Sequence, residues 1–339
     1  MWNRRQLLKA SLAAPLAPLL PGCRSAPPAP PAWDRAAYRR PAQSRVAVLA
    51  ASSYQQPLDR ILLDGLRLFE GDLWGGNLAG KTVVLKPNLV EYDPKGVINT
   101  DPAVVAAALE AFRRLGAAQV LVAEGPGHRR DTEYLLTASG LYAVLKEHQA
   151  AFVDLNSDDV RPLRPASRFT RLNELYLPET VLRADLLVSM PKMKTHHWVG
   201  VTLAMKNLFG ILPGAIYGWP KNLLHWAGIG NSIIDINSTV PARQFAIVDG
   251  IVGMEGNGPL QGDAKPCGVL VLGPDLVAVD ATAARLMKID PGRVEYLAQA
   301  GQFLGNLSEQ AITQIGERID RHQQDFRVLD SFRPLKVAG

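Results

Sequence analysis

From Arg45 onward the chain alternates short β-branched apolar runs with longer segments of helical periodicity, and this alternation limits the fold more than any other feature. We expect buried strands at 46–49, 82–85, 120–123, 151–154, 184–189, 244–248 and 268–272. The helices expected between them span 57–70, 101–115, 132–148, 201–208 and 276–287. Because neighbouring parallel strands need a crossover, which is usually a helix, this order predicts an α/β fold. Its mostly parallel sheet or sheets are flanked by helices, as one extended sheet or as two Rossmann-like halves.

The first 22 residues have the features of an export signal. Arg4 and Arg5 precede the uncharged stretch 10–20, which two prolines interrupt. This stretch is shorter than the roughly 20 apolar residues that a membrane-spanning helix needs. We therefore expect residues 1–22 to be a twin-arginine signal peptide rather than a permanent membrane span.

Cys23 ends the sequence Leu-Pro-Gly-Cys, which resembles a lipobox, the site where bacterial lipoproteins are cleaved and acylated. Residues 23–44 are rich in proline and alanine, a composition that favours an extended tether. We expect an exported, periplasmic protein of the cell envelope, held to the membrane by a lipid anchor only. The alternative is a plain export signal with Cys23 as a bystander. The α/β domain should span 45–339, and any division into two lobes should fall near 160–184.

Composition excludes several classes of function. The formal net charge is +5, and the leader residues Arg4, Arg5 and Lys9 carry three of these charges. Bulk charge therefore gives no case for a nucleic-acid partner. Two cysteines, Cys23 and Cys267, are too few for a disulfide framework, a four-thiolate zinc site or a self-contained iron–sulfur cluster. Any redox metal would have to come from elsewhere.

Polar side chains follow four of the expected strands. Ligands of open parallel sheets bind at the carboxyl ends of the strands, where the connecting loops converge. We therefore expect the residues after these strands to form a site: Lys86 and Asn88 after the second, Glu124 after the third, Lys192, Lys194, Thr195 and His196 after the fifth, and Asp249 and Glu255 after the sixth.

Four lysines determine what this site would bind. Lys192 and Lys194 lie two residues apart and share a face if their segment is extended, and Lys206 lies on a helix just beyond. If Lys86 converges on the same point, the ammonium groups repel one another unless a carboxylate or phosphate lies between them. Crowding also lowers a lysine pKa and makes a neutral amine available as a base or nucleophile. The alternative is that these lysines point outward as a solvated surface.

The histidines and acidic residues leave the question of a metal open. His196 and His197 are adjacent, so in an extended segment we expect only one of them to face the site. A metal could recruit Glu124, Asp249 or Glu255, although their spacing matches no recognised metal motif.

Three further features have two interpretations each. The segment 250–262 contains five glycines and is expected to be a surface loop or a ligand lid, and it is not a dinucleotide fingerprint. Asp280 lies in an apolar helix, either on its solvent face or paired with a lysine. The aromatic residues of 216–226 should pack a lid or long loop onto the body. The alternative is a stacking wall or a docking patch.

Several short motifs match a known pattern when they are taken together. They are Lys86-Pro87-Asn88, Pro191-Lys192-Met193-Lys194-Thr195-His196, Lys206-Asn207 with Gly210, Asp249-Gly250, Glu255-Gly256-Asn257-Gly258-Pro259 and Ala278-Val279-Asp280. Over about 82–291 the chain resembles family 362 of the domains of unknown function, an uncharacterised bacterial and archaeal family. The resemblance implies no established reaction. Some members are joined to iron–sulfur ferredoxin modules, but this chain lacks their cysteine clusters, so no such centre is carried over.

We therefore expect an enzyme that binds an anionic small molecule at the strand ends, with its reaction class, cofactor and any metal left open. The expected catalytic residues are Lys192, Lys194, His196 and Asp249. The expected ligand-binding residues are Lys86, Asn88, Glu124, Thr195, Lys206, Asn207, Glu255 and Asp280. The alternative is a non-catalytic envelope binding protein, or an accessory subunit of a redox partner that contributes the iron–sulfur cluster.

Overall fold

The computed structural model describes residues 38, 40–73, 77–127 and 131–337, which belong to one compact unit. The expected signal peptide, Cys23 and most of the tether lie outside the described residues. Export and lipidation therefore stay predictions. No helix within the described ranges is long and apolar enough to cross a bilayer.

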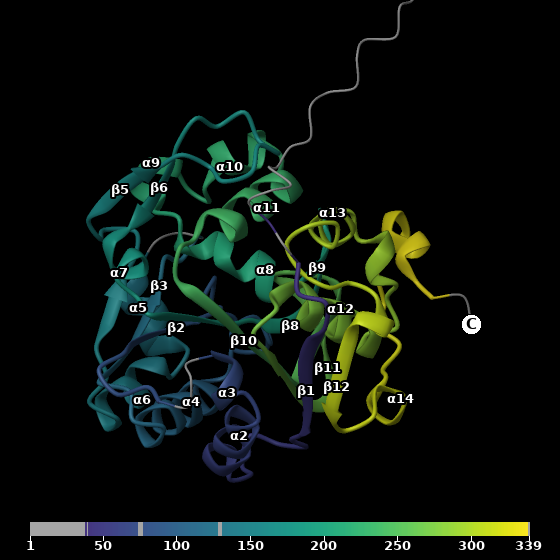
Figure 1. Ribbon diagram of the computed structural model, residues 1–339, viewed down its shortest axis with the longest axis horizontal. Coiled ribbons are helices and arrows are strands. Elements are labelled where there is room, and N and C mark those ends of the chain that lie inside the picture. The colour runs from purple at the N-terminus through teal and green to yellow at the C-terminus, as the bar shows by residue number, and fades with distance from the viewer. Residues whose placement is uncertain (1–37, 39, 74–76, 128–130, 338–339) are drawn as a thin grey trace, which may run out of the picture. The chain divides into compact units, whose positions relative to one another are not determined.

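One mixed sheet organises the described part of the chain (Figure 1). Its path runs in the order β12 (Ile312–Gly316), β1 (Ser44–Ala50), β11 (Gln261–Gly273), β10 (Arg243–Asn257), β7 (Leu186–Met190), β2 (Thr82–Pro87), β3 (Gln119–Glu124) and β4 (Phe152–Asp154). Off this path, β8 (Lys192–His196) pairs in parallel with β10 and antiparallel with β9 (Gly200–Thr202). Only the pairs β1–β11, β10–β11 and β8–β9 of this sheet are antiparallel among the described strands. The predicted α/β fold with a mostly parallel sheet is confirmed.

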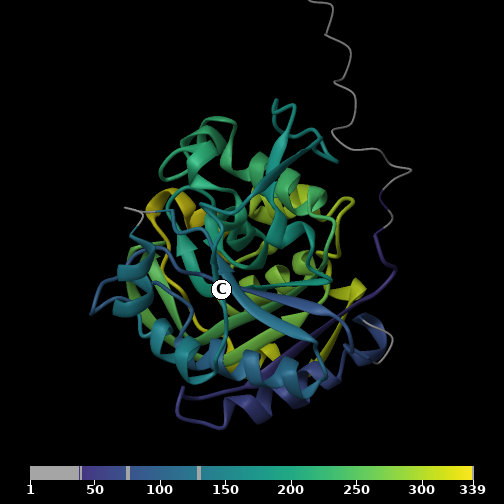
Figure 2. The same ribbon diagram turned by 90° about the vertical axis from the view of Figure 1, so that its left-hand side faces the viewer.

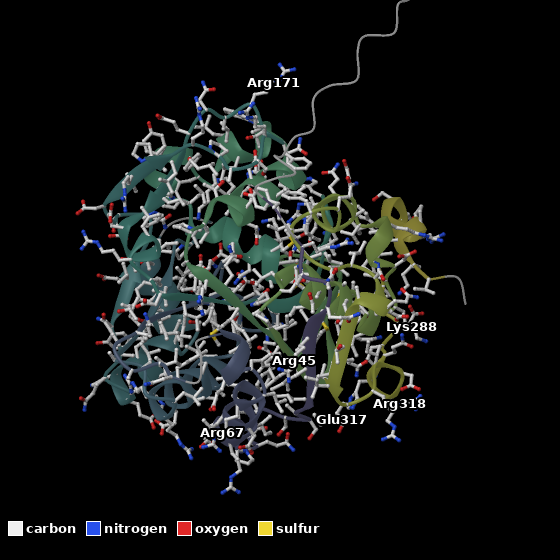
Figure 3. The ribbon with its side chains drawn as sticks, viewed as in Figure 1. Arg45, Arg67, Arg171, Lys288, Glu317 and Arg318 are labelled. Carbon is white, nitrogen blue, oxygen red and sulfur yellow. The ribbon has the colours of Figure 1, made fainter. Side chains whose placement is uncertain are left out.

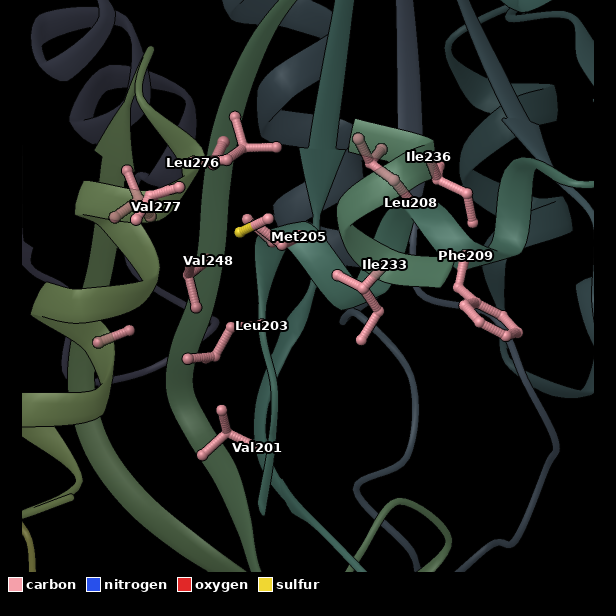
Figure 4. Packing of buried hydrophobic residues seen from close by; sticks show 14 of the residues in the cluster. Val201, Leu203, Met205, Leu208, Phe209, Ile233, Ile236, Val248, Leu276 and Val277 are labelled. Atoms are coloured by element: carbon pink, nitrogen blue, oxygen red, sulfur yellow. The ribbon is translucent and has the colours of Figure 1, made fainter. Parts of the chain in front are cut away.

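Helices cover both faces of the sheet, because successive strand residues point to opposite faces. One core packs Val83 and Val188 against α2 (Leu58–Arg67), α4 (Pro102–Arg114), α5 (Thr132–Ala138) and α6 (Leu141–Glu147). The other packs Val84 and Leu187 against α8 (Ala204–Asn207), α11 (Ile229–Thr239), α12 (Leu276–Leu286) and α13 (Glu295–Ala300). Figure 2 shows helices on both sides of the sheet, and Figure 4 shows the second core around α8.

The remaining elements are short. The described chain also contains α3 (Glu70–Leu73), α7 (Glu179–Leu182), α9 (Gly214–Tyr217), α10 (Asn222–Trp226), α14 (Ile319–His322) and the 3₁₀ helices η1 (Leu208–Ile211), η2 (Pro291–Arg293), η3 (Glu309–Ala311) and η4 (Asp330–Leu335). Two strands, β5 (Val160–Leu163) and β6 (Leu175–Pro178), pair antiparallel as a separate small sheet. The main sheet takes strands from both sides of 160–184.

Helix α4 begins where its sequence signals predict. The Asp101 side chain accepts a hydrogen bond from the Ala103 backbone N–H at 2.9 Å, and Pro102 occupies the first turn, where no N–H is needed. Arg113 and Arg114 lie in the last turn, where positive charge interacts favourably with the helix dipole. This start places the N-terminus of α4 at the carboxyl edge of the sheet, where the Asp101 N–H donates to Asp249.

Most of the glycine-rich segment 250–262 is strand rather than the predicted surface loop or lid, and only the turn at 258–260 lies outside the strands. β10 and β11 continue through it as one long hairpin, with Gly253 opposite Lys265 and Gly256 opposite Gly262. The glycines allow close packing of backbones, since a Cβ at Gly253 would lie 2.7 Å from the Met193 carbonyl oxygen on β8. For the strand residues the prediction was wrong, because glycine was interpreted as a turn signal rather than as a sign of close approach.

Two other predicted segments differ from the structure. The helix expected at 201–208 starts only at Ala204, because 200–202 form β9. A helical crossover joins β1 to β2, the first two strands along the chain, but the two are not neighbours in the sheet. β1 lies between β11 and β12 instead. The order of segments along the chain therefore predicts the strands and helices, but not which strands are neighbours in the sheet.

Candidate functional site

A cavity of about 410 Å³ lies at the carboxyl ends of β2 and β3, beside β8, α8 and α10. Its lining contains these basic residues: Lys86, Lys194, His196, His197, Lys206, Lys221 and His225. Glu124 is the only acidic residue among the described residues of the lining. Charged side chains usually point outward, as Arg67, Arg171 and Arg318 do in Figure 3, so this buried concentration of cations is unusual.

Lys86 and Glu124 form a buried ion pair in the cavity wall. Lys86 is fully buried and Glu124 is 2% exposed. The Lys86 Nζ also donates to Asn207 Oδ1 at 3.1 Å, and Glu124 accepts from the Gly125 N–H at 2.9 Å. Burial lowers the pKa of Lys86, while the Glu124 charge raises it. The charges of this pair are balanced within the protein.

The other three lysines of the lining have no carboxylate partner among the described residues. Lys194 Nζ donates to the carbonyl oxygens of Ile98 and Pro259 at 2.8 and 3.3 Å. Lys221 Nζ donates to two other carbonyl oxygens at 2.7 and 2.8 Å. Lys206 Nζ lies 4.1 Å from the centre of the Phe209 ring. Carbonyl groups and a ring only partly replace the hydration that a buried cation loses.

Burial lowers the pKa of each of these three lysines. The pKa of Lys194 falls well below its usual value, and the neighbouring charges of Lys206, Lys192 and Lys86 lower it further. Burial brings the pKa of Lys206 to about 8 and that of Lys221 to about 7. Each of these lysines therefore holds its proton less tightly than an exposed lysine does, and an anion next to its Nζ would raise its pKa again.

His196 is held in one protonation state. Its Nδ1 accepts a hydrogen bond from the Trp198 backbone N–H at 3.0 Å. Burial, followed by the Lys206 charge, lowers the pKa of His196 far below its usual value, so the ring is neutral. The remaining ring proton is then on Nε2, and the side chain can donate a hydrogen bond from that atom.

Both adjacent histidines line the cavity, so the prediction that only one would face the site is wrong. β8 ends at His196 and the chain turns there, which removes the alternation of an extended strand. His197 Nδ1 lies 2.9 Å from the Gly258 carbonyl oxygen and donates to it. No group of three or more histidine, cysteine or acidic side chains in the described ranges is arranged to hold a metal ion.

Two oxygen atoms in lining residues lack a hydrogen-bond partner within the described chain. They are Asn88 Oδ1 and Thr202 Oγ1, whose residues are 7% and 4% exposed. A buried polar atom without a partner costs free energy, about 1–3 kcal/mol. A polar ligand in the cavity could supply the missing hydrogen bonds.

Lys192 and Asp249 form a second buried ion pair and do not line the cavity. Lys192 Nζ lies 2.5 Å from Asp249 Oδ2 and 2.8 Å from the Tyr54 hydroxyl. Asp249 also accepts from the Asp101 N–H at 3.0 Å. Burial raises the pKa of Tyr54, and the Asp249 charge adds to this rise, so the hydroxyl stays protonated. The pair ties β8, which carries Lys194 and His196, to β10 and the start of α4.

Three other predicted ligand residues also lie outside the cavity lining. Thr195 Oγ1 donates to the Gly256 carbonyl oxygen at 2.9 Å, and Glu255 pairs with Arg327 and Lys265. Asp280 is neither solvent-exposed nor paired with a lysine: it is fully buried and accepts from two backbone N–H groups at the start of α8. Burial raises the pKa of Asp280 to about 8. This residue supports the helix that carries Lys206.

Lys221 is the main site residue that the sequence did not single out for ligand binding. It lies among the aromatic residues of 216–226 and is 2% exposed. Its backbone is in the left-handed region, with φ of 70°, which lysine rarely adopts. The sequence carries no strand or motif that would place it beside Glu124. His128, which follows β3 in the sequence, lies outside the described residues.

Comparison with known proteins identifies the family. Residues 83–285 match the family described as Domain of unknown function (DUF362). The chain belongs to this family. The DUF362 region contains all the residues that line the cavity. The recognition of the family from its motifs is confirmed.

One relative of this DUF362 protein is the thylakoid-associated protein sll1697 of Synechocystis. The two are 30% identical over 268 residues, which cover 75% of this chain and 77% of the relative. Two solved structures match more weakly: a Thermotoga maritima protein and the lactate racemase apoprotein of Thermoanaerobacterium thermosaccharolyticum. Their TM-scores are 0.37 and 0.39 at 13% and 17% identity, over 67% and 66% of this chain. The matched parts span 58% and 54% of those chains.

Proposed function

We propose that this protein binds an anionic small molecule, a carboxylate or a phosphate, in the cavity and acts on it as an enzyme. The observation that carries the proposal is the excess of lysines over carboxylates in the described lining. Lys194, Lys206 and Lys221 have no carboxylate partner among the described residues, whereas Lys86 is balanced by Glu124. Protein sites of this kind use buried cations to hold anions that water would otherwise solvate.

The remaining groups of the site have complementary roles in this proposal. Asn88 supplies a polar contact, Asn207 holds the Lys86 amine, and the neutral His196 donates from Nε2 to a ligand oxygen. Lys192 and Asp249 position β8 and do not contact the ligand. His196 therefore stabilises negative charge on oxygen rather than accepting a proton.

Anion binding should be accompanied by proton uptake. Burial lowers the pKa of Lys221 to about 7 and that of Lys194 well below its usual value. A bound anion raises them again, so protons enter with the ligand and affinity falls as the pH rises through this range. Titration calorimetry with inorganic phosphate and with a dicarboxylate, in two buffers of different ionisation enthalpy, measures this uptake.

Lys194→Met is the variant for this experiment, since methionine keeps most of the side-chain volume and removes the charge. We expect affinity to fall at least about tenfold, which is about 1.4 kcal/mol. Lys146→Met changes an exposed lysine of α6 and should bind as the wild type does. Equal binding by both variants, or binding without proton uptake, would contradict the proposed site.

The same proposal includes export by the twin-arginine route and a lipid anchor on Cys23. Support comes from the paired Arg4 and Arg5, the Leu-Pro-Gly-Cys sequence and the proline-rich tether after it. Replacing Cys23 with serine should release the protein from membranes into the soluble envelope fraction, as measured by fractionation and immunoblot. Unchanged membrane retention of the variant would rule out the anchor.

A further inference from the structure

We propose that Lys206 is a nucleophile that forms an imine with a carbonyl group of the bound anion. The substrate class is then an anion that carries an aldehyde or ketone, such as a 2-oxo acid. This inference rests on the proposed function, because it takes the cavity as the place where an anion binds. It adds a reacting atom and a functional group on the ligand.

The surroundings of the Lys206 amine differ from those of the other cavity lysines. Lys86, Lys194 and Lys221 each donate hydrogen bonds to two or more oxygen atoms. Lys206 Nζ makes no hydrogen bond or ion pair within the described chain, and its contact is with the face of Phe209. Because no hydrogen bond of the described chain fixes the Lys206 Nζ, the neutral amine can turn its lone pair toward a carbonyl carbon of the ligand. Lys206 is part-buried, and it lines the cavity.

Burial, followed by the Lys86 charge, favours the neutral form of the Lys206 amine, which is the nucleophilic form. Burial is the main cause of its lowered pKa of about 8, and the Lys86 charge adds to it while Glu124 opposes it. The groups whose charges act with that of Lys206 come from several elements: Lys86 on β2, Glu124 on β3, Lys194 and His196 on β8, Lys221 before α10 and His225 on α10. Among the described residues, Glu124 is the acid that lines the cavity with these cations, and Asp154 also acts on Lys221.

Hydrogen bonds to neighbouring elements fix the position of the backbone around Lys206, although α8 is short. The N–H groups of Ala204 and Met205 donate to Asp280 on α12 at 2.7 and 3.0 Å. The Met205 carbonyl oxygen accepts from Asn237 on α11 at 2.9 Å. The next residue, Asn207, donates to the Lys86 carbonyl oxygen at 3.1 Å. Nucleophilic catalysis needs such a fixed support, because small displacements of the reacting atom greatly slow the reaction.

The chemistry requires no oxidant or reductant. The lone pair of the neutral Nζ forms a bond to the carbonyl carbon, and the carbonyl π electrons move to oxygen, which takes up a proton. The resulting carbinolamine loses water, whose two hydrogens balance the two that the nitrogen gives up, and a C=N bond forms. The anionic group of the ligand pairs with Lys194 and Lys221, and His196 donates from Nε2 to the developing oxyanion.

Reductive trapping tests the inference. The full-length protein is incubated with pyruvate or 2-oxoglutarate and sodium borohydride, and intact mass spectrometry and peptide mapping follow. We expect one adduct per chain, on Lys206, with a yield that increases as the pH rises through about 8. Lactate, which has no carbonyl carbon that an amine can attack in this way, should give no adduct.

Two variants separate charge from nucleophilicity. Lys206→Arg keeps the positive charge and cannot form an imine, so it should lose the adduct completely. Lys146→Arg alters an exposed lysine and should be trapped like the wild type. An adduct that persists in Lys206→Arg, or that maps to another lysine, would overturn the assignment.

Phosphate titration distinguishes failure of the imine from failure of the site. If wild-type protein binds phosphate with proton uptake and neither oxo acid is trapped, the imine is wrong and the anion site stands. If phosphate, dicarboxylate and oxo acids all fail to bind, both proposals fall. Trapping on Lys206 together with phosphate binding supports both.

Discussion

Replacing Glu124 with glutamine should destabilise the protein by about 3–5 kcal/mol, the range found when one partner of a buried ion pair is removed. Glutamine has nearly the same shape, so packing changes little and the effect comes from charge. Lys86 is fully buried and would retain Asn207 and the Pro87 carbonyl oxygen as partners, without a balancing anion. Urea unfolding followed by circular dichroism measures the change, as a shift in midpoint at a constant slope.

The pH dependence of Glu124→Gln gives a second check with a defined sign. Burial already lowers the pKa of Lys86 in the folded protein. Without the Glu124 charge the pKa of Lys86 falls further. The folded state then binds fewer protons than the unfolded state over a wider range of pH. Stability of the variant should therefore rise as pH rises toward the usual lysine pKa.

Two control variants make the result specific. Glu133→Gln removes an exposed acid of α5 and should change stability by less than about 0.5 kcal/mol. The double variant Lys86→Met/Glu124→Gln removes both charges and should recover part of the loss, because no buried cation is left unpaired. A cost below about 1 kcal/mol for Glu124→Gln alone, at neutral pH, would show that the pair does not carry buried charge.

Gly210→Ala should abolish most ligand binding without removing any functional group. A Cβ at Gly210, in η1, would overlap Glu124 Oε1 and lie 2.8 Å from Lys86 Nζ. Neither group can move far, because both are held by hydrogen bonds in a buried wall. Overpacking of this kind costs about 1–3 kcal/mol of stability. We expect the affinity for inorganic phosphate to fall at least about tenfold.

Gly71→Ala is the matched control for this prediction. It lies in the short helix α3, where an added Cβ meets nothing within 4 Å. Calorimetric titration and thermal unfolding of both variants separate the effect of the site from the general effect of alanine. Wild-type affinity in Gly210→Ala would mean that the Lys86–Glu124 wall is not part of the binding site.

Part of the site could be predicted from the sequence, because strand ends can be recognised locally. Lys86, Asn88 and Glu124 follow apolar runs that are strands in the structure, and parallel strands bring their carboxyl ends to one edge. Lys194 could be placed by the same argument. These residues lie at the cavity although 38 positions separate Lys86 from Glu124 along the chain.

The rest could not be predicted, because it depends on contacts between distant segments. Lys221 lies in an irregular segment with no periodic pattern, and its hydrogen bonds to Gly125 and Gly210 arise from tertiary packing. Lys192 and Lys194 have similar sequence contexts, yet the first pairs with Asp249 and the second faces the cavity. Which lysine meets a carboxylate depends on strand order, and local sequence does not determine that order.

Native mass spectrometry of the protein isolated from its own cells tests the central claim, that the cavity holds an anionic small molecule. We expect one small anionic ligand per chain, released on denaturation, and its loss in Lys194→Met. Exchange of the ligand for inorganic phosphate should also be visible. A wild-type protein with the mass of the bare chain, to which neither phosphate nor a dicarboxylate can be added, would contradict the account.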